Sequence, residues 1–392
     1  MDSRRTTYLK ELMVLGGHWA NFSGYRFGLL LYIFQIIKFL YFFVGWIFIL
    51  INLFNRGIKY LLSPSAVFIP LGANIVFTSF ALFLKLNKIE KLIRISNYHL
   101  MTYHEDWEKD IIEFETNRII YLGNLLKYGF GFFSIVYQAL NIVIDIVRCF
   151  MGYTETYTLP IPFEGYLSDG KERNLHFYFV VMASNLWVFC GVANSISCQA
   201  SLFLLLSYTT TQIAILKERL KRLVNEDDTD IHLLPSWDVD VIIKRHQQII
   251  RLNSFQKDCM PLPYLIQGLI STISYCFIMY LINQLIGRDN LVLILAVMFM
   301  FMMLGFMFFM CYVGSYLEEE GNKLFYVLCH LPWERQCPDS RKDLVFLIRQ
   351  GRQPLGLVYR CSFGLNLRTY MQMVNQAFSY FMLMKSLDQN NS

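Results

Sequence analysis

The sequence predicts an all-α membrane protein with seven transmembrane helices, and three observations support this fold class. Of its 392 residues, 55% are hydrophobic and 16% are aromatic, which points to a polytopic membrane domain more than to a set of soluble domains. The hydrophobic residues gather in seven long stretches. The Lys and Arg residues gather in alternate gaps between those stretches.

Each hydrophobic stretch is long enough to cross a bilayer as a helix. About 20 residues at a rise of roughly 1.5 Å per residue span a hydrocarbon core of about 30 Å. No internal repeat or low-complexity segment interrupts the series. The predicted transmembrane helices cover residues 27–54, 64–84, 119–147, 175–209, 262–287, 291–316 and 362–387.

The positive charges predict the orientation of these helices. Twenty-five of the thirty-five Lys and Arg residues lie before the first stretch or within 85–118, 217–257 and 323–360, and six lie in the other gaps. Loops rich in Lys and Arg stay in the cytoplasm, so we expect a cytoplasmic N-terminus and an external C-terminus. A rhodopsin-like G-protein-coupled receptor has the opposite orientation.

The cation-rich gaps carry apolar residues at helical spacing, which predicts short amphipathic helices. Such helices can lie on the membrane surface or can pack together below it. We favour packing, because four apolar stripes on one side of the membrane can bury each other. The predicted cytoplasmic anchor domain therefore contains the stripes Leu216, Leu220 and Leu223; Ile242, Ile249 and Leu252; Leu324, Val327 and Leu331; and Leu344, Leu347 and Ile348.

The seventh stretch is the least apolar, and its polar residues share one helical face. Along this face the spacing is four, three, four and three residues, and amides within a bilayer need water or hydrogen-bond partners. The stripe can bond to neighbouring helices of the same subunit, or it can line a pore that an apolar collar at Leu383 and Leu387 closes by dewetting. The candidate pore residues are Gln372, Gln376, Ser379, Leu383, Ser386 and Leu387.

Several chemical functions find no support in the sequence. There is no CxxC or HxxxH spacing, so we expect no metal site, and no cofactor motif is present. The formal charge of +5 is small and lies mainly in the predicted cytoplasmic loops, which favours contact with membrane lipid over nucleic acid. Without a nucleophile–base pair or a phosphate-binding glycine loop, we do not expect an enzyme.

The C-terminal third resembles the insect odorant receptors. In these proteins a Gly-Asn pair, an aromatic–Trp segment, an Arg-x-x-Pro-Leu element and a terminal aromatic helix follow the sixth span. The counterparts are Gly321-Asn322, Tyr326 with Leu331-Pro332-Trp333, Arg352-Gln353-Pro354-Leu355 and the run from Phe378 to Lys385.

This resemblance implies an odorant-gated, non-selective cation channel, a heterotetramer in the plasma membrane of sensory neurons. In such a channel a divergent tuning subunit binds a small volatile organic odorant and assembles with a shared co-receptor. Laid on the co-receptor's last helix, the chain has gate residues at Leu383 and Leu387, but it has Ser386 where the co-receptor has a pore glutamine. It also lacks the co-receptor's long insertion between spans four and five, so the resemblance implies a tuning subunit.

In this family the odorant pocket lies in the external half of the membrane, among spans two, three, four and six. Aromatic and Met side chains there suit a small volatile ligand, because they are polarisable and demand few hydrogen bonds. The corresponding residues are Phe68, Leu71, Ile75, Phe133, Ser134, Tyr137, Asn141, Ser184, Trp187, Val188, Phe301 and Met302.

The domain organisation follows from these assignments. We expect a cytoplasmic N-terminal segment at 1–26, six transmembrane helices with the ligand pocket at 27–316, a cytoplasmic anchor segment at 317–361, and the pore-lining helix with a short external C-terminus at 362–392.

Two other receptor classes remain as alternatives. The insect gustatory receptors share the topology, and Thr369-Tyr370 with Gln376-Ala377-Phe378 comes within one residue of their terminal pattern. The run Phe378-Ser379-Tyr380-Phe381 favours the odorant receptors over them. A G-protein-coupled receptor is disfavoured by the orientation and by the absence of its Asp-Arg-Tyr and Asn-Pro-x-x-Tyr motifs.

Overall fold

In the residues that it describes, the computed structural model is all-helical apart from one very short hairpin, which confirms the predicted fold class. It describes residues 4–5, 7–8, 11, 28–57, 64–103, 105–150, 162–163, 175–225, 236–287, 290–331, 333–359 and 363–391. The main helices are α2 (Gly28–Arg56), α4 (Phe68–Met101), α5 (Asp106–Phe150), α6 (Leu175–Asn225), α7 (Ser236–Cys259), α8 (Pro261–Leu285), α9 (Asn290–Cys329), α10 (Pro338–Gly351) and α11 (Leu367–Asn391). The described residues also form two 3-10 turns, η1 (Pro64–Val67) and η3 (Trp333–Arg335).

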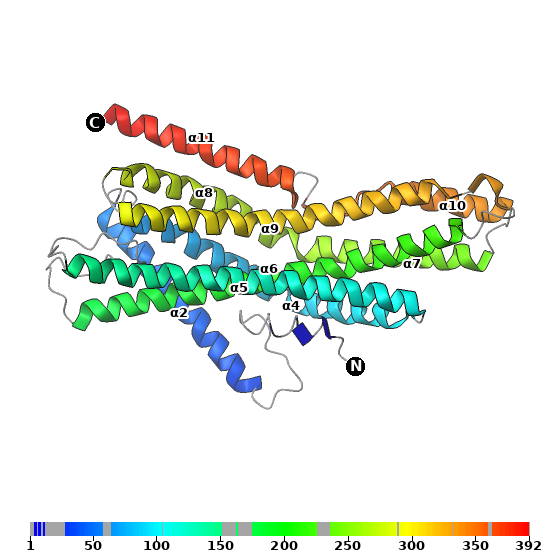
Figure 1. The fold of residues 1–392 in the computed structure, drawn as a ribbon, viewed down its shortest axis with the longest axis horizontal. Coiled ribbons are helices and arrows are strands. Elements are labelled where there is room, and N and C mark those ends of the chain that lie inside the picture. Colours follow the sequence, from blue (N-terminus) through cyan, green and yellow to red (C-terminus); the bar gives the residue numbers. More distant parts are fainter. Residues whose placement is uncertain are drawn as a thin grey trace.

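The long helices lie side by side in an elongated bundle (Figure 1). α4, α5, α6 and α9 run along much of its length, and α7 and α10 cover one end. α8 lies beside α9 at the other end, where α11 extends along the outside and α2 crosses the bundle obliquely (Figure 1). The bundle therefore has two ends. α2, α8 and α11 lie at one end, and α7 and α10 lie at the other.

The helices match the predicted spans, although several continue well beyond them. Five helices in the described part of the chain are long and apolar enough to cross a membrane: α2, α5, α6, α8 and α9. α4 contributes a shorter apolar stretch, Ser65–Ala81, and α11 is not among the five. The predicted boundary at 316 falls inside α9, which continues without a break to Cys329.

Local sequence signals mark several helix ends. Asp106 and Glu108 lie in the first turn of α5, where negative charge is favourable beside the free backbone N–H groups. Pro261 begins α8, a position at which the missing N–H of proline removes no hydrogen bond. α2 and α8 are followed by Gly57 (φ 59°) and Gly287 (φ 77°), which end them in the left-handed conformation that glycine adopts without a steric penalty.

The amphipathic stripes pack on one another at the α7 and α10 end, as predicted. Leu216 and Leu220 of α6, Ile242, Ile249 and Leu252 of α7, Leu324 and Leu331 of α9, and Leu344 and Leu347 of α10 are all buried in one core. Val327 and Ile348 are partly buried against that core. The alternative of separate helices on the membrane surface leaves these side chains without the neighbours that they have here. Leu223 lies outside the residues whose side chains are described.

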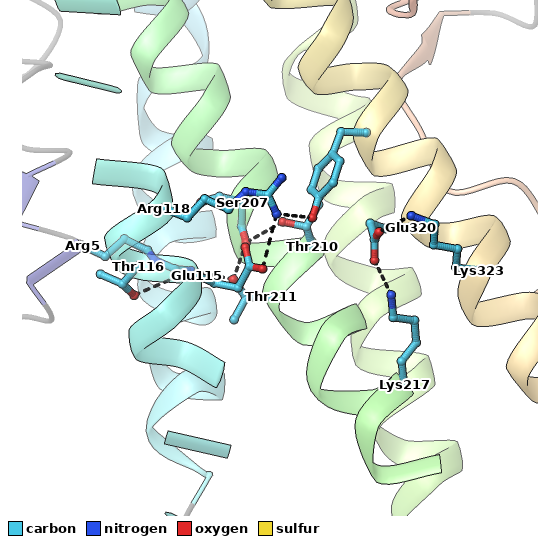
Figure 2. A network of polar contacts seen from close by, with 11 residues as sticks. Arg5, Glu115, Thr116, Arg118, Ser207, Thr210, Thr211, Lys217, Glu320 and Lys323 are labelled. Atoms are coloured by element: carbon cyan, nitrogen blue, oxygen red, sulfur yellow. Dashed lines mark hydrogen bonds and ion pairs between the residues drawn. The ribbon is translucent and has the colours of Figure 1, made fainter. Parts of the chain in front are cut away.

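A buried arginine near the N-terminus joins α5 and α6 (Figure 2). Arg5 is 1% exposed, and its two terminal nitrogens donate hydrogen bonds to Thr211 Oγ1 at 3.1 Å and to Thr116 Oγ1 at 3.0 Å. Burial lowers the pKa of Arg5 to about 10, so the side chain stays protonated at neutral pH. The contacts fasten the N-terminal segment to the middle of the bundle.

A second group of charges joins α6 to α9 nearby (Figure 2). Glu320 of α9 pairs with Lys217 of α6 and, at 3.0 Å, with Lys323 one turn further along α9. Both carboxylate oxygens of Glu320 have a cationic partner, as a largely buried carboxylate requires. This contact holds α6 and α9 together where they enter the α7 and α10 end.

The seventh predicted helix begins later than expected. Its predicted start is residue 362, but Val358–Tyr359 and Phe363–Gly364 pair as two-residue antiparallel strands, and α11 begins at Leu367. Asn366 explains this start, because its Oδ1 accepts hydrogen bonds from Thr369 N and Thr369 Oγ1, both at 3.0 Å. An Asn before the first turn is a strong N-cap.

Candidate functional site

A cavity of about 60 Å³ lies between α4, α6, α8 and α9. Its wall is mainly aromatic and aliphatic, with methionines from α9 and a few polar groups. None of its described lining residues carries a charge. The lining residues are Phe68, Leu71, Asn74 and Ile75 of α4; Trp187, Val188, Gly191, Val192, Ser195 and Gln199 of α6; Gln267 and Ser271 of α8; and Phe299, Met302, Met303, Phe306 and Met307 of α9.

One end of the cavity is aromatic. The ring of Phe68 lies 6.2 Å from that of Trp187 and 6.3 Å from that of Phe299, measured between centroids. Tyr137 of α5 stands behind this end, with its ring 5.6 Å from that of Phe299. These rings offer a polarisable surface with no obligatory hydrogen bond, which suits an apolar ligand.

The other end of the cavity is polar. Asn74 Nδ2 donates to Ser271 Oγ at 3.3 Å, and Asn74 Oδ1 accepts from Thr78 Oγ1 at 3.1 Å. Gln199 and Gln267 also line this end, and the Oε1 atom of each is buried without a hydrogen-bond partner in the described part of the chain. Amides held within an apolar helix bundle are costly, so this end is a candidate ligand contact.

Six of the twelve ligand residues expected from the resemblance line the cavity: Phe68, Leu71, Ile75, Trp187, Val188 and Met302. Tyr137, Ser134 and Ser184 are buried but do not line it. Phe133 is 40% exposed and Phe301 is 68% exposed, so both side chains lie at the outer surface of the bundle. The side chain of Asn141 lies outside the described residues.

The polar end of the cavity does not follow from the residues predicted from the sequence. Asn74, Ser195, Gln199, Gln267 and Ser271 were not among the expected ligand residues. A signal was present, because Asn74, Gln199 and Gln267 are amides inside otherwise apolar stretches, and intramembrane polar residues often mark functional sites.

Trp187 is part of the fold as well as of the cavity. Its indole is 2% exposed and stacks on Phe42 of α2 with the ring centroids 4.4 Å apart. The indole N–H donates to the Phe42 carbonyl oxygen at 3.0 Å, and Phe163 meets the indole edge to face at 6.2 Å. Trp187 thus joins α2 to α6 behind the cavity.

The predicted pore face of α11 is exposed in the single chain. Met373 and Ala377 are buried against the bundle, whereas Gln372, Gln376, Ser379, Leu383 and Ser386 are all exposed. Ser379 and Ser386 donate only to carbonyls of α11 itself, at 3.0 and 2.8 Å. Within the described residues, then, the stripe makes no hydrogen bond to a neighbouring helix. The side chain of Leu387 is not described.

α9 connects the cavity to the start of α11. Met307 lines the cavity, and the next residue, Phe308, meets Tyr370 of α11 edge to face at 5.7 Å. Two turns further along α9, Ser315 Oγ accepts a hydrogen bond from Leu367 N at 2.8 Å. The same helix that lines the cavity therefore also contacts the first turn of α11.

The sequence matches the model of a known protein family. The family model described as the 7tm Odorant receptor matches residues 65–378, most of the chain. The chain belongs to the 7tm odorant receptor family. The matched segment contains the whole cavity and α11 as far as Phe378.

Two curated odorant receptors share low but detectable sequence identity with this chain. Odorant receptor 85c of Drosophila melanogaster is 23% identical over 275 residues, which are 68% of this chain and 65% of that protein. Odorant receptor 10 of Aedes albopictus is 23% identical over 176 residues, which are 44% of this chain and 46% of that protein. The match thus spans somewhat less than two thirds of the Drosophila receptor and less than half of the Aedes receptor.

Solved structures of the insect olfactory receptor OR5 from Machilis hrabei have the same fold. The complex with eugenol matches with a TM-score of 0.77 over 97% of both chains, at 11% identity. A second structure of the same receptor matches with a TM-score of 0.72 over 96% of both chains, also at 11% identity. At this identity the likeness establishes the odorant receptor fold alone.

Proposed function

We propose that this chain is the odorant-binding subunit of a heterotetrameric, ligand-gated, non-selective cation channel. In this proposal it assembles with the shared odorant co-receptor in the plasma membrane of sensory neurons and transduces olfactory signals. Its N-terminus and the α7 and α10 end lie in the cytoplasm, and a small volatile organic odorant enters the cavity between α4, α6, α8 and α9.

The cavity carries this proposal. It is apolar along most of its wall and lies against α6, α8 and α9, three of the helices that are long and apolar enough to cross a membrane, so it suits a small hydrophobic molecule. Its volume of about 60 Å³ is well below the size range of most ligand sites, so odorant binding must displace side chains. The methionines of α9 are the flexible part of the wall and can make that space.

The route from the cavity to α11 supports a channel mechanism. Displacement of Met303 or Met307 by an odorant moves α9, and Phe308 and Ser315 hold the first turn of α11. The exposed polar face of α11 would then line a pore shared with the corresponding helices of the other subunits. Binding drives opening if the odorant prefers the wider cavity of the open state.

Current recordings test the proposal. In cells that lack odorant receptors, this chain alone should give no odorant-evoked current, and co-expression with the co-receptor should restore one. The co-receptor alone supplies the background for each odorant.

A tag after Ser392 should be reached by antibody on intact cells, and a tag before Met1 should be reached only after permeabilisation. Robust cation currents from the chain alone, or the opposite placement of the tags, would contradict the proposal.

The proposed gate makes a separate prediction at Leu383, which is 58% exposed on α11. Replacing it with serine lets water persist in an apolar collar, so Leu383→Ser should raise ligand-independent current in the co-expressed channel. The rise should be partial, because the other subunits keep their own apolar residues. Met382→Ser is the matched control, since Met382 is 48% exposed and points about 100° away around the helix.

Basal current is measured per channel, beside surface abundance. An unchanged basal current for Leu383→Ser at normal abundance removes Leu383 from the gate. Equal rises for Leu383→Ser and Met382→Ser point to a general loosening of α11.

A further inference from the structure

We propose that the polar end of the cavity selects odorants that carry a hydroxyl group, with Gln199 and Gln267 as its binding residues. This inference rests on the proposed function, because it assumes that the cavity binds odorants. It adds the chemical class of the ligand and the orientation in which that ligand binds.

The first observation is the state of the two amides. Gln199 is 1% exposed and Gln267 is 7% exposed, and the Oε1 atom of each is buried without a partner in the described structure. A buried acceptor without a donor is unfavourable. A ligand that brings a donor to this end therefore gains more than one that brings only apolar surface.

The second observation is that Asn74 and Ser271, on the other side of this end, already bond to each other. Asn74 donates to Ser271 and accepts from Thr78. These bonds hold the α4 and α8 sides of the polar end in place without using either glutamine. Among the described side chains that line this end of the cavity, Gln199 and Gln267 are the ones with a buried acceptor that lacks a hydrogen-bond partner.

The third observation is the polarity along the cavity. Trp187 marks the aromatic end and Gln199 the polar end, and the two residues are roughly three helical turns apart on α6. Phe68 and Phe299 complete the aromatic end. A matching ligand has an apolar body that lies against the rings and the methionines, and a polar group at its other end.

The absence of charge among the lining residues decides which polar group fits. A carboxylate or an ammonium would enter a site whose described lining residues carry no charge, which is unfavourable. An ether, ketone or ester only accepts hydrogen bonds and cannot supply the donor that Oε1 lacks. A hydroxyl donates to one amide oxygen and accepts from an amide N–H, so alcohols and phenols match best.

Isomeric odorants test this inference in cells that co-express the chain and the co-receptor. Each alcohol is paired with an ether of the same formula, such as octan-1-ol with 1-methoxyheptane, over short and long chains and over benzylic pairs. Ketones and esters of similar size complete the panel. The half-maximal concentration of the best alcohol should be at least about tenfold lower than that of its ether.

Two variants assign the effect to the amides. Gln199→Met and Gln267→Met keep the length of the side chain and remove its amide. Each should raise the half-maximal concentration of the alcohol by about tenfold and leave that of the ether unchanged or lower. Gln138→Leu is the control, because Gln138 of α5 donates to the Asn185 carbonyl oxygen at 3.3 Å and does not line the cavity. It should not change the ratio of alcohol to ether sensitivity.

The outcomes separate the two proposals. Responses to ethers, ketones or esters that exceed the responses to alcohols overturn hydroxyl selection and leave odorant gating intact. Equal shifts for alcohol and ether in both Gln→Met variants also overturn it, since they indicate a general change of cavity shape. If both variants fail to reach the surface, Gln199→Leu and Gln267→Leu repeat the comparison. If these fail as well, the ratio of alcohol to ether sensitivity of the unsubstituted receptor decides whether hydroxyl selection stands. A receptor at the cell surface that responds to no odorant of any class overturns the proposed function itself.

Discussion

Gly314→Ala is expected to abolish odorant-evoked current and to lower the amount of folded protein. A Cβ atom added at Gly314 of α9 would lie 1.8 Å from the carbonyl oxygen of Leu365 and 2.8 Å from its carbonyl carbon. These are backbone atoms, so no side-chain rotation relieves the clash. Overpacking of this kind costs about 3 kcal/mol or more when the backbone must move.

The backbone at Leu365 has little freedom to move away. Leu365 N donates to the Leu357 carbonyl oxygen at 2.9 Å, and Leu367 N donates to Ser315 Oγ. Gly314→Ala therefore separates α9 from the start of α11 or displaces the short hairpin. In either case the route proposed for gating is broken.

Surface abundance, melting temperature of the purified protein and current of the co-expressed channel measure the effect. Gly131→Ala is the matched control, because a Cβ at Gly131 of α5 meets nothing within 4 Å. Alanine also favours the helix by up to about 1 kcal/mol there. If Gly314→Ala has the same melting temperature and currents as the unsubstituted receptor, the close approach of α9 to Leu365 is dispensable.

The close contact at Gly314 illustrates which parts of the fold the sequence reveals. Helices and their buried stripes follow from short-range periodicity, so Leu216, Ile249 and Leu344 were placed in a helical core from their spacing alone. The contact of Gly314 with Leu365 joins residues about fifty positions apart and leaves no periodic signal. The N-cap at Asn366 was visible in principle as an Asn three residues before Thr369, but the predicted helix began at 362.

The candidate site, too, is only partly predictable from the sequence. The resemblance indicated three of the helices that line the cavity, α4, α6 and α9, but it gave the third span, α5, where the cavity has α8. The face that each helix presents also depends on its neighbours. On α5, Ser134 and Tyr137 are buried while Phe133 is 40% exposed, although Phe133 and Tyr137 are four residues apart. On α9, Met302 lines the cavity and the preceding residue, Phe301, points outward. A few tens of degrees of helix rotation decide such cases, and sequence spacing does not fix them.

Trp187→Ala is expected to remove most of the folded receptor from the cell surface. Trp187 is among the largest fully buried side chains described, and it contacts Phe42, Phe68 and Phe163. Truncating a buried aromatic side chain to alanine costs about 3–5 kcal/mol, because apolar contact is lost and a cavity remains. That loss is a large fraction of the about 5–15 kcal/mol by which folded proteins are usually stable.

Trp187→Phe separates packing from hydrogen bonding at the same position. It keeps an aromatic ring against Phe42 and removes the indole N–H that donates to the Phe42 carbonyl oxygen at 3.0 Å. The cost should be about 1–2 kcal/mol, so the variant should reach the surface in reduced amount. Because Trp187 also lines the cavity, the receptors that do reach the surface should respond to odorants with altered sensitivity.

Phe189→Ala is the control for the loss of an aromatic side chain from α6, since Phe189 is 52% exposed and lies only two residues further along the helix. We expect surface abundance and melting temperature to fall steeply for Trp187→Ala, moderately for Trp187→Phe and little for Phe189→Ala. If Trp187→Ala reaches the surface at the level of the unsubstituted receptor, the α2–α6 contact contributes little to stability. A change in odorant sensitivity without loss of protein would then make Trp187 a ligand contact rather than a structural residue.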